Sequence, residues 1–368
     1  MEYPIKQDRK RTLQDIAREA KVSVASVSHA LNGKGRLSPS TRRLLEQRLR
    51  DAGYRLFARR YPVLYICHQD QFEDVQAYKP IFDQHSGLSR FFVENGINLR
   101  FELLSVRNKS DLRDELIRML EAQPAAVVVS TDLHGLASHV VAWFTENGVP
   151  VVQIGHTNNI QGIHSVVIDN FTAGRMAAEY LAKQGHKRIG IIRWWAKKDP
   201  VSAETFAGFC CGLQAAGIDL PDEYVVETAE HTSASGPLQG RDGMDQLLAL
   251  EHPPTGVFVE NSMVSPSLIY PCSCEDKEAW LKTQEVEMIH FESWHLDWLE
   301  SALGQKLLFP QRATALIKID WQMVGQVAAE RTFAIIEGTE VHESTQIVRI
   351  APTLVRAEGM EITPISLS

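Results

Sequence analysis

The sequence lacks a long hydrophobic run. Across its 368 residues there is no segment of about 18 uncharged apolar residues, the length that a helix needs to cross a bilayer. The first ten residues are polar and charged, without the apolar stretch of a secretory signal. We therefore expect neither a membrane span nor export, and a protein that stays in the cytoplasm.

Cysteine is scarce, and the motifs of common enzyme chemistries are missing. The chain has five cysteines, without a Cys-x-x-Cys pair or a histidine at zinc spacing, so we expect reduced thiols. Cys272 and Cys274 form a lone Cys-x-Cys, which lacks the full ligand set of a closed zinc site.

The chain also has no G-x-S-x-G, no G-x-x-x-x-G-K-[ST], no H-E-x-x-H and no G-x-G-x-x-G after a strand. The sequence therefore predicts no catalytic residue, no resident metal and no cofactor.

Acidic residues are depleted at the start of the chain. Residues 1–61 hold fifteen Lys and Arg against six Asp and Glu, although the whole chain has a net charge of −8. The remaining residues hold 23 basic and 40 acidic side chains. Clustered cations displace the counterions that condense on phosphates, so such a segment is suited to binding a polyanion. The charge distribution predicts that this chain contacts nucleic acid through its N-terminal part only.

Three helix starts are recognisable in the basic segment. Thr12 caps a first helix, with Asp15 in capping-box position. Ser23 caps a second helix after a tight turn, and Ser38 caps a third, which ends at Gly53. Apolar residues at helical spacing are expected to face the interior: Leu13, Ile16, Ala17, Ala20, Val27, Ala30, Leu31, Leu44, Leu45 and Leu49. The pattern predicts a helix-turn-helix followed by a third helix; the alternative is a generic three-helix bundle with solvated charges.

The basic segment with its three predicted helices, called the head below, closely resembles the DNA-binding domain of the LacI/GalR family of bacterial transcription regulators. The resemblance covers Thr12 to Arg55, which reads TLQDIAREAKVSVASVSHALNGKGRLSPSTRRLLEQRLRDAGYR. Its most specific parts are V-S-V-A-S-V-S-H-A-L-N, S-x-x-T-R and the G-Y ending. The resemblance implies that the second helix lies in the major groove of DNA, with base edges read by Val24, Ala25 and His29. It also implies phosphate contacts from Ser23, Ser26, Ser28 and Asn32.

The chemistry of the three base-reading candidates fits that role. His29 can donate a hydrogen bond to the N7 or O6 of a guanine, whereas Val24 and Ala25 offer apolar contact, for instance to a thymine methyl. Base preference would then depend mainly on His29. The alternative is that His29 is an ordinary exposed polar residue on a helix surface.

The link between head and body departs from the family pattern. The family hinge helix, roughly Y-x-P-N-x-x-A-R-x-L, is shortened here and lacks its Pro-Asn, and Pro62 prevents a helix from continuing. Leu56 or Phe57 could still insert into the minor groove as an apolar wedge. The alternative is that the link only touches phosphates, through Arg55, Arg59 and Arg60.

The body alternates apolar strands with amphipathic helices, which predicts βαβ units and parallel sheets. Strands are expected at 63–67, 98–105, 125–130, 149–154, 165–169, 188–192, 256–260 and 287–291. Helices fall between them, for example at 111–121 and 174–184. In such sheets ligands bind at the carboxyl ends of the strands.

The family resemblance extends through the body. Residues 165–192, SVVIDNFTAGRMAAEYLAKQGHKRIGII, resemble the family's V-D-N-x-x-G segment and its G-H-x-x-I-G, and residues 206–218 resemble its G-F-x-x-A-L-x-x-A-G-I. The resemblance implies a type I periplasmic-binding-protein-like effector domain, an α/β fold of two lobes joined by three crossings. A small molecule would bind between the lobes, and the body would form a homodimer. The implied division is a head at 1–61 and a body at 62–368, with lobe 1 at about 62–162 and 293–321 and lobe 2 at about 163–292 and 322–355.

The implied pocket departs from the family at three positions. The family arginine before the G-F motif is replaced by Thr205, the Asn-Asp pair by Glu260 and Asn261, and the acid of G-F-D by Glu292. Two carboxylates facing the pocket would repel an anionic ligand. We therefore expect a neutral ligand.

Further ligand candidates lie after predicted strands. Trp194, Trp195 and Trp294 could stack on a sugar, or could be ordinary core residues. Asp70 and Gln71 follow the first strand, together with His68 and Gln69; Asp132 follows a later one, and these residues could instead cap helices. The candidate ligand-binding residues are Asp70, Gln71, Asp132, Trp194, Thr205, Glu260, Glu292 and Trp294.

Together these features predict a homodimeric, sequence-specific transcription regulator that binds a double-stranded DNA operator. We expect a repressor rather than an activator, acting on carbohydrate-utilisation genes and controlled by a neutral, sugar-like effector. A transport-type solute receptor is disfavoured by the DNA-binding head and by the missing signal peptide. An enzyme is disfavoured because the chemistries that carry a recognisable motif lack their signatures here. The remaining alternative is a DNA-binding regulator with a degenerate pocket, controlled by a partner protein or a non-sugar ligand.

Overall fold

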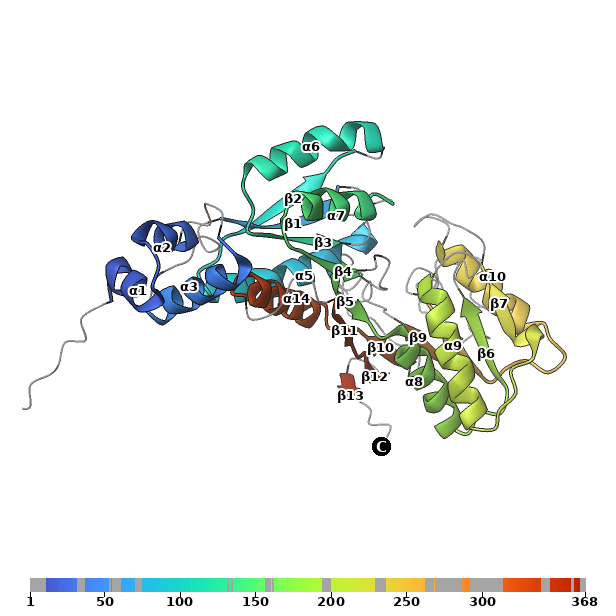
Figure 1. Ribbon diagram of the computed structural model, residues 1–368. Helices are drawn as coiled ribbons and strands as arrows, with labels where there is room; N and C mark the ends of the chain where they lie inside the picture. Colours follow the sequence, from blue (N-terminus) through green and yellow to red (C-terminus); the bar gives the residue numbers. More distant parts are fainter. Residues whose placement is uncertain are drawn as a thin grey trace, which may run out of the picture.

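The structure is a computed structural model of the chain. It describes residues 11–31, 37–52, 54, 61–69, 75–106, 108–130, 133, 135–155, 160, 162–193, 200–228, 236–261, 268, 286–291, 314–338, 345–358 and 361–364. Figure 1 shows a small helical head followed along the molecule by two β-sheets, each flanked by helices. None of the helices described is long and apolar enough to cross a membrane.

The head consists of α1 (Leu13–Ala20), α2 (Val24–Leu31) and α3 (Pro39–Asp51). Its core contains Ile16, Val27, Leu45 and Leu49, each without exposed surface. The predicted capping box of α1 is confirmed, and Ser23 and Ser38 each accept a hydrogen bond from the backbone amide three residues on. The expectation that Leu44 is buried was wrong, because it is 46% exposed. Leu45 and Leu49, four residues apart, share the inner face of α3, and Leu44 lies one position around the helix from them.

Lobe 1 is built on a parallel sheet with strand order β11-β5-β4-β3-β1-β2. Its strands are β1 (Val63–His68), β2 (Leu99–Leu104), β3 (Ala126–Ser130), β4 (Val151–Gly155), β5 (His164–Ile168) and β11 (Ile347–Ile350). The flanking helices are α5 (Val75–Glu94), α6 (Lys109–Glu121), α7 (Ala137–Glu146) and α14 (Trp321–Ile336). Alternate residues of β1 point to opposite faces of the sheet. On one face they pack in an apolar cluster with residues of α5 and α14, and on the opposite face in a second cluster with residues of α6 and α7. The sheet is therefore covered on both faces, as parallel sheets require.

Lobe 2 is built on a sheet with strand order β13-β12-β10-β9-β8-β6-β7. Its strands are β6 (Ile189–Arg193), β7 (Val225–Glu227), β8 (Gly256–Val259), β9 (Glu287–Phe291), β10 (Thr314–Lys318), β12 (Thr353–Glu358) and β13 (Glu361–Pro364). The helices α8 (Asn170–Lys183) and α9 (Pro200–Ala215) pack together, and α10 (Gly236–Leu248) packs against β6 and β7. β12 and β13 run antiparallel to their neighbours, whereas the other strands pair in parallel.

Within the described residues the chain crosses between the lobes three times, but not where the sequence-based boundaries placed the crossings. β5 pairs with β4, so the first crossing falls at Asp169 rather than near 163. β10 pairs with β9 in lobe 2, although 293–321 was assigned to lobe 1. α14 and β11 pack in lobe 1, although 322–355 was assigned to lobe 2. The lobe to which a segment belongs is decided by strand pairing between distant segments, and the local periodicity of the sequence does not indicate that pairing.

The first two crossings are built alike. Asp169 directly follows β5 and caps α8, and Asp320 follows β10 after one intervening residue and caps α14. Five residues further on, Gly174 and Gly325 bring each helix against a partner helix, α9 and α5 respectively. A Cβ on either glycine would collide with a backbone carbonyl oxygen of the partner. Each crossing therefore continues into a closely packed helix pair.

Candidate nucleic-acid interface and effector site

The start of α2 is fixed by a tight turn and a serine cap. Lys21 ends α1 in the left-handed conformation, with φ of 54°, which turns the chain within three residues. The Ser23 Oγ accepts a hydrogen bond from the Ser26 amide at 3.0 Å and lies 2.9 Å from the Ser26 Oγ. Val27, Ala30 and Leu31 then anchor the helix in the core of the head.

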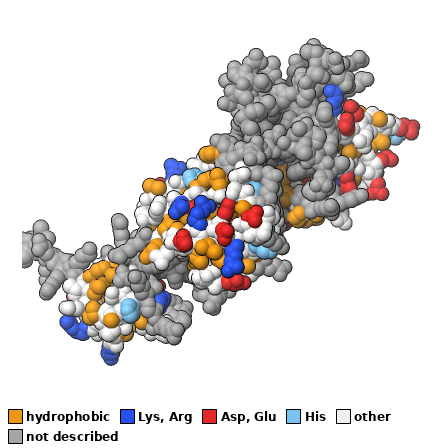
Figure 2. Space-filling view, turned by 90° about the horizontal axis from the view of Figure 1, so that it is seen from above, with side chains coloured by type: hydrophobic (Ala, Val, Ile, Leu, Met, Phe, Trp, Pro, Cys, Tyr) orange, Lys and Arg blue, Asp and Glu red, His pale blue; other side chains and the backbone are white. Residues whose placement is uncertain are grey.

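The outer face of α2 carries the three base-reading candidates. Val24 is 43% exposed, and Ala25 and His29 are also exposed, while Ser26 and Ser28 are partly buried. Figure 2 shows hydrophobic side chains beside a histidine on one face of the head, with basic side chains at its rim. An exposed apolar surface with one hydrogen-bonding ring is suited to the edges of base pairs. Two other predicted contacts, Asn32 and Leu56, lie outside the described residues.

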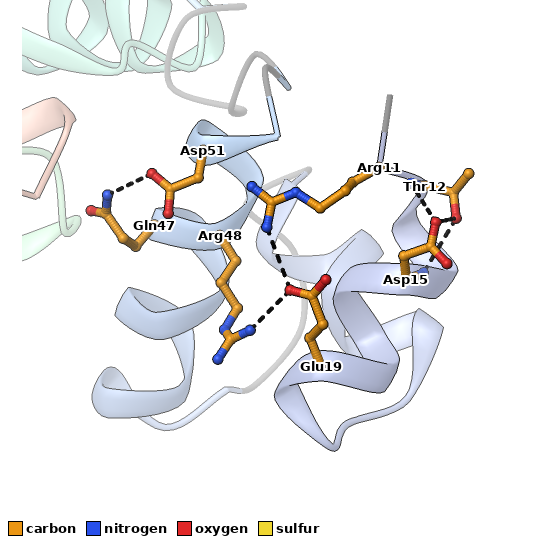
Figure 3. Close-up of polar contacts among 7 residues, drawn as sticks. All are labelled: Arg11, Thr12, Asp15, Glu19, Gln47, Arg48 and Asp51. Carbon is orange, nitrogen blue, oxygen red and sulfur yellow. Dashed lines mark hydrogen bonds and ion pairs between the residues drawn. The ribbon is translucent and has the colours of Figure 1, made fainter. Parts of the chain in front are cut away.

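Polar contacts join α1 and α3, the two helices that pack against α2. Glu19 of α1 accepts hydrogen bonds from Arg48 of α3 at 3.1 Å and from Arg11 at 3.5 Å (Figure 3). The Tyr54 hydroxyl donates to the Arg11 carbonyl oxygen at 3.0 Å, which ties the two ends of the head together. Glu19 and Tyr54 therefore connect α1, α3 and the segment that leads to the body.

In lobe 2, a buried arginine lies at the carboxyl end of β6. Arg193 is 7% exposed, and its guanidinium donates from Nη1 to Glu227 Oε1 at 3.1 Å and from Nη2 to Ser202 Oγ at 3.3 Å. Its Nε lies 3.6 Å from Glu260 Oε2, and its Cζ lies 3.9 Å from the centre of the Phe206 ring. Residues from β6, β7, α9 and the end of β8 thus meet at the sheet edge where ligands bind in this architecture.

Glu260 belongs to the same cluster. It is 4% exposed and accepts a hydrogen bond from the Ser202 hydroxyl at 2.9 Å. Arg193 compensates the charge of Glu260, so this carboxylate does not act on an anionic ligand as the uncompensated charge that the sequence led us to expect. Counting Glu227, the cluster still holds one more carboxylate than cations. Arg193 was not predicted as a site residue from the sequence. Its position as a charged residue at the end of an otherwise apolar strand could have indicated it.

Thr205, which the resemblance places where the family has an arginine, is fully buried against α8. Its hydroxyl donates to the Val201 carbonyl oxygen of the same helix at 2.8 Å. In this structure the side chain is thus engaged within α9, beside the cluster around Arg193. The other ligand candidates, Asp70, Gln71, Asp132, Trp194, Glu292 and Trp294, lie outside the described residues.

In lobe 1 the corresponding strand end carries His68. The residue is fully buried, and its Nε2 lies 3.0 Å from the Val106 carbonyl oxygen. The next residue, Gln69, donates its amide to the Leu104 carbonyl oxygen at 2.9 Å. The beginning of the loop after β1 is therefore held against the end of β2.

Two family models match the chain. Residues 12–55 match "Bacterial regulatory proteins, lacI family", and residues 79–357 match "Periplasmic binding proteins and sugar binding domain of LacI family". The chain is 25% identical to Catabolite control protein A of Priestia megaterium over 269 residues, 70% of this chain and 76% of the relative. It is 27% identical to the HTH-type transcriptional repressor CytR of Escherichia coli K12 over 264 residues, 71% and 74% of the two chains.

Solved structures show the same fold. A complex of the transcriptional regulator CelR with cellobiose is similar over 95% of this chain and 100% of its own, with a TM-score of 0.58 and 20% identity. A lac repressor dimer bound to operator and the anti-inducer ONPF is similar over 96% and 99%, with a TM-score of 0.55 and 16% identity. From the helix-turn-helix head, the two-sheet body and the family models that match both, we conclude that the chain belongs to the LacI family of DNA-binding transcription regulators, with an effector-binding domain.

Proposed function

We propose that this protein is a dimeric repressor of carbohydrate-utilisation genes, whose affinity for a specific operator is controlled by a neutral, sugar-like effector. The observation that carries the DNA-binding part is the outer face of α2. Val24, Ala25 and His29 are exposed there together, on a helix whose opposite side is locked into the core. A rigid helix with exposed reading residues can enter a major groove without reorganising the head.

The residues of this face would have separate roles. His29 would donate to a guanine, and Val24 and Ala25 would contact a thymine methyl. Ser23 and Ser26, at the N-terminus of α2, would lie near phosphates, which favour the positive end of a helix dipole. Phosphate contacts fix the register of the head on DNA, and base contacts supply the preference.

A dimer would place two heads on a pseudo-palindromic operator. The lac repressor structure of the same fold is described as a dimer bound to operator. A two-fold axis relating two heads requires half-sites related by the same axis. The operator of this protein is accordingly expected to contain an inverted repeat.

The effector site supports a neutral ligand. Both Nη atoms of the Arg193 guanidinium are engaged by Glu227 and Ser202, so an anion would meet a cation that is already paired, within a cluster of net negative charge. Hydroxyl groups can instead donate to carboxylates. The CelR structure contains cellobiose, a ligand of this chemical class. Control by a partner protein remains the second candidate, because three ligand positions depart from the family pattern.

Selection of bound duplexes from a random pool tests the DNA-binding part. We expect an enriched inverted repeat, and we expect His29→Ala to weaken binding to it by about 5- to 150-fold per altered base contact. Binding to scrambled DNA at the same salt concentration should change little. Gln47→Ala, an exposed polar residue on α3, serves as the matched control and should leave both affinities unchanged. Equal losses on selected and scrambled DNA with His29→Ala would refute the assigned role.

Thermal-shift screening tests the effector part. The panel contains neutral mono- and oligosaccharides, sugar acids and nucleobases, since a ligand that binds only the folded state raises the melting temperature. We expect a neutral saccharide to stabilise the protein. If no compound does so while a partner protein does, the sugar-sensing role is wrong and the second candidate replaces it.

A further inference from the structure

An ion pair joins the two lobes beside the first crossing. Glu204 lies on α9 of lobe 2, and its Oε1 is 2.5 Å from Nη1 of Arg349. Arg349 lies on β11 of lobe 1, where it is paired with Val167 of β5. The other carboxylate oxygen, Oε2, accepts a hydrogen bond from Nδ2 of the buried Asn170 at 3.2 Å, and Asn170 is the first residue of α8 after the crossing.

The same part of α9 borders the Arg193 cluster, which belongs to the proposed effector site. Ser202 and Phe206, two residues on either side of Glu204, both contact Arg193. Gly174 and Gly208 pack α9 closely against α8, so the helix can move only with its partner or by sliding along it. Glu204 therefore lies between the residues that contact Arg193 and the contact with lobe 1.

We propose that Glu204 and Arg349 are positioning residues that set how far the two lobes stand apart over the effector site. The inference deepens the proposed function, because it gives lobe 2 a defined contact with lobe 1, the lobe that follows the head. The side chains of Arg349 and Glu204 are 49% and 25% exposed. Ion pairs so exposed add little to stability, so this pair is expected to bias the distribution of distances between the lobes and not to fix a single distance.

The chain offers a matched control for an ordinary surface ion pair. Arg175 and Glu179 on α8 are also 2.5 Å apart, and their side chains are 42% and 28% exposed. Both residues belong to one helix of lobe 2. Breaking this pair removes a similar electrostatic contact without removing a link between the lobes.

The distance between the lobes is measured by double electron–electron resonance on the full chain. Spin labels are introduced as encoded, non-cysteine amino acids at Glu146 on α7 and Gln246 on α10, both exposed. Arg349→Gln should shift the ratio of near to far populations by about 1.5- to 5-fold. Arg349→Lys, which keeps the charge, should restore the wild-type distribution at least in part, and Arg175→Gln should leave it unchanged.

The distance measurement requires neither operator nor effector, so it is judged separately from the proposed function. A distribution that Arg349→Gln leaves unchanged, or that Arg175→Gln alters equally, overturns the inference. Failure of the wild-type protein to prefer any duplex would instead refute the proposed function, whatever the distances show. If the inference and the proposed function are both correct, Arg349→Gln should also change the affinity for the selected duplex by a similar factor. The reason is that the equilibrium between near and far lobes is then coupled to DNA binding.

Discussion

Replacing Arg193 tests how the lobe 2 site is held together. Arg193→Met keeps a long side chain and removes the positive charge. The Glu260 side chain is 3% exposed. In the variant its carboxylate keeps the hydrogen bond from the Ser202 hydroxyl and loses the neighbouring positive charge of Arg193. Removing one partner of a buried ion pair costs about 3–5 kcal/mol, because the remaining charge is uncompensated. We expect the free energy of unfolding to fall by at least about 3 kcal/mol.

A second substitution separates the charge effect from lost packing. Adding Glu260→Gln removes the uncompensated charge and keeps an acceptor for Ser202. Replacing both partners of a buried pair is often close to neutral, so the double variant should recover at least about 2 kcal/mol relative to Arg193→Met. Arg188→Met is the control, since Arg188 is exposed and donates to the Pro253 carbonyl oxygen at 2.9 Å. It should cost less than about 1 kcal/mol.

Urea denaturation followed by circular dichroism gives these differences, and hydrogen exchange of β6, β8 and β9 shows whether the loss lies in lobe 2. Equal destabilisation by Arg193→Met and Arg188→Met would refute the account of the cluster. So would a double variant as unstable as the single one, because the missing charge compensation would then not be the cause.

Three further predictions concern other parts of the chain. Thr12→Ala removes the capping box of α1 and should destabilise the head by about 1 kcal/mol, seen as faster hydrogen exchange of α1 amides; unchanged exchange contradicts it. Gly174→Ala forces α8 and α9 apart and should lower the unfolding free energy by about 1–3 kcal/mol, whereas an unaltered melting temperature would show that the helices adjust freely. Burial raises the pKa of the Cys210 thiol, so its alkylation should need a more alkaline pH and lag behind that of exposed Cys211, as followed by mass spectrometry; the reverse order contradicts this.

Local features of the head are predictable from the sequence. The caps at Thr12, Ser23 and Ser38 act within three residues, so the sequence pattern alone places the helix starts. The eight predicted strands are likewise confirmed to within a few residues, because a buried strand is a short apolar run bounded by turns. Leu44 shows the limit of this reasoning, since an apolar residue next to a core position can remain exposed.

The arrangement of the lobes and the polar clusters depends on contacts between distant residues. Glu204 and Arg349 are 145 positions apart, and no local pattern indicates that they meet. Arg193 and Glu260 are brought together by the parallel pairing of β6 with β8. The strands that were missed, such as β10 and β12, complete a sheet whose order only tertiary pairing defines. The sequence therefore predicts the elements, and the structure is needed to assign them to lobes.

Competition between a selected duplex and scrambled DNA tests the central claim most directly. The full-length protein is titrated with the inverted repeat recovered from the random pool, at one moderate salt concentration and without added metabolite. We expect a preference of at least about 1,000-fold, since the side chains that α2 exposes, Val24, Ala25 and His29, are the ones proposed to contact base edges. Equal affinity for the two duplexes would contradict it, because binding would then arise from the basic charge of the head alone.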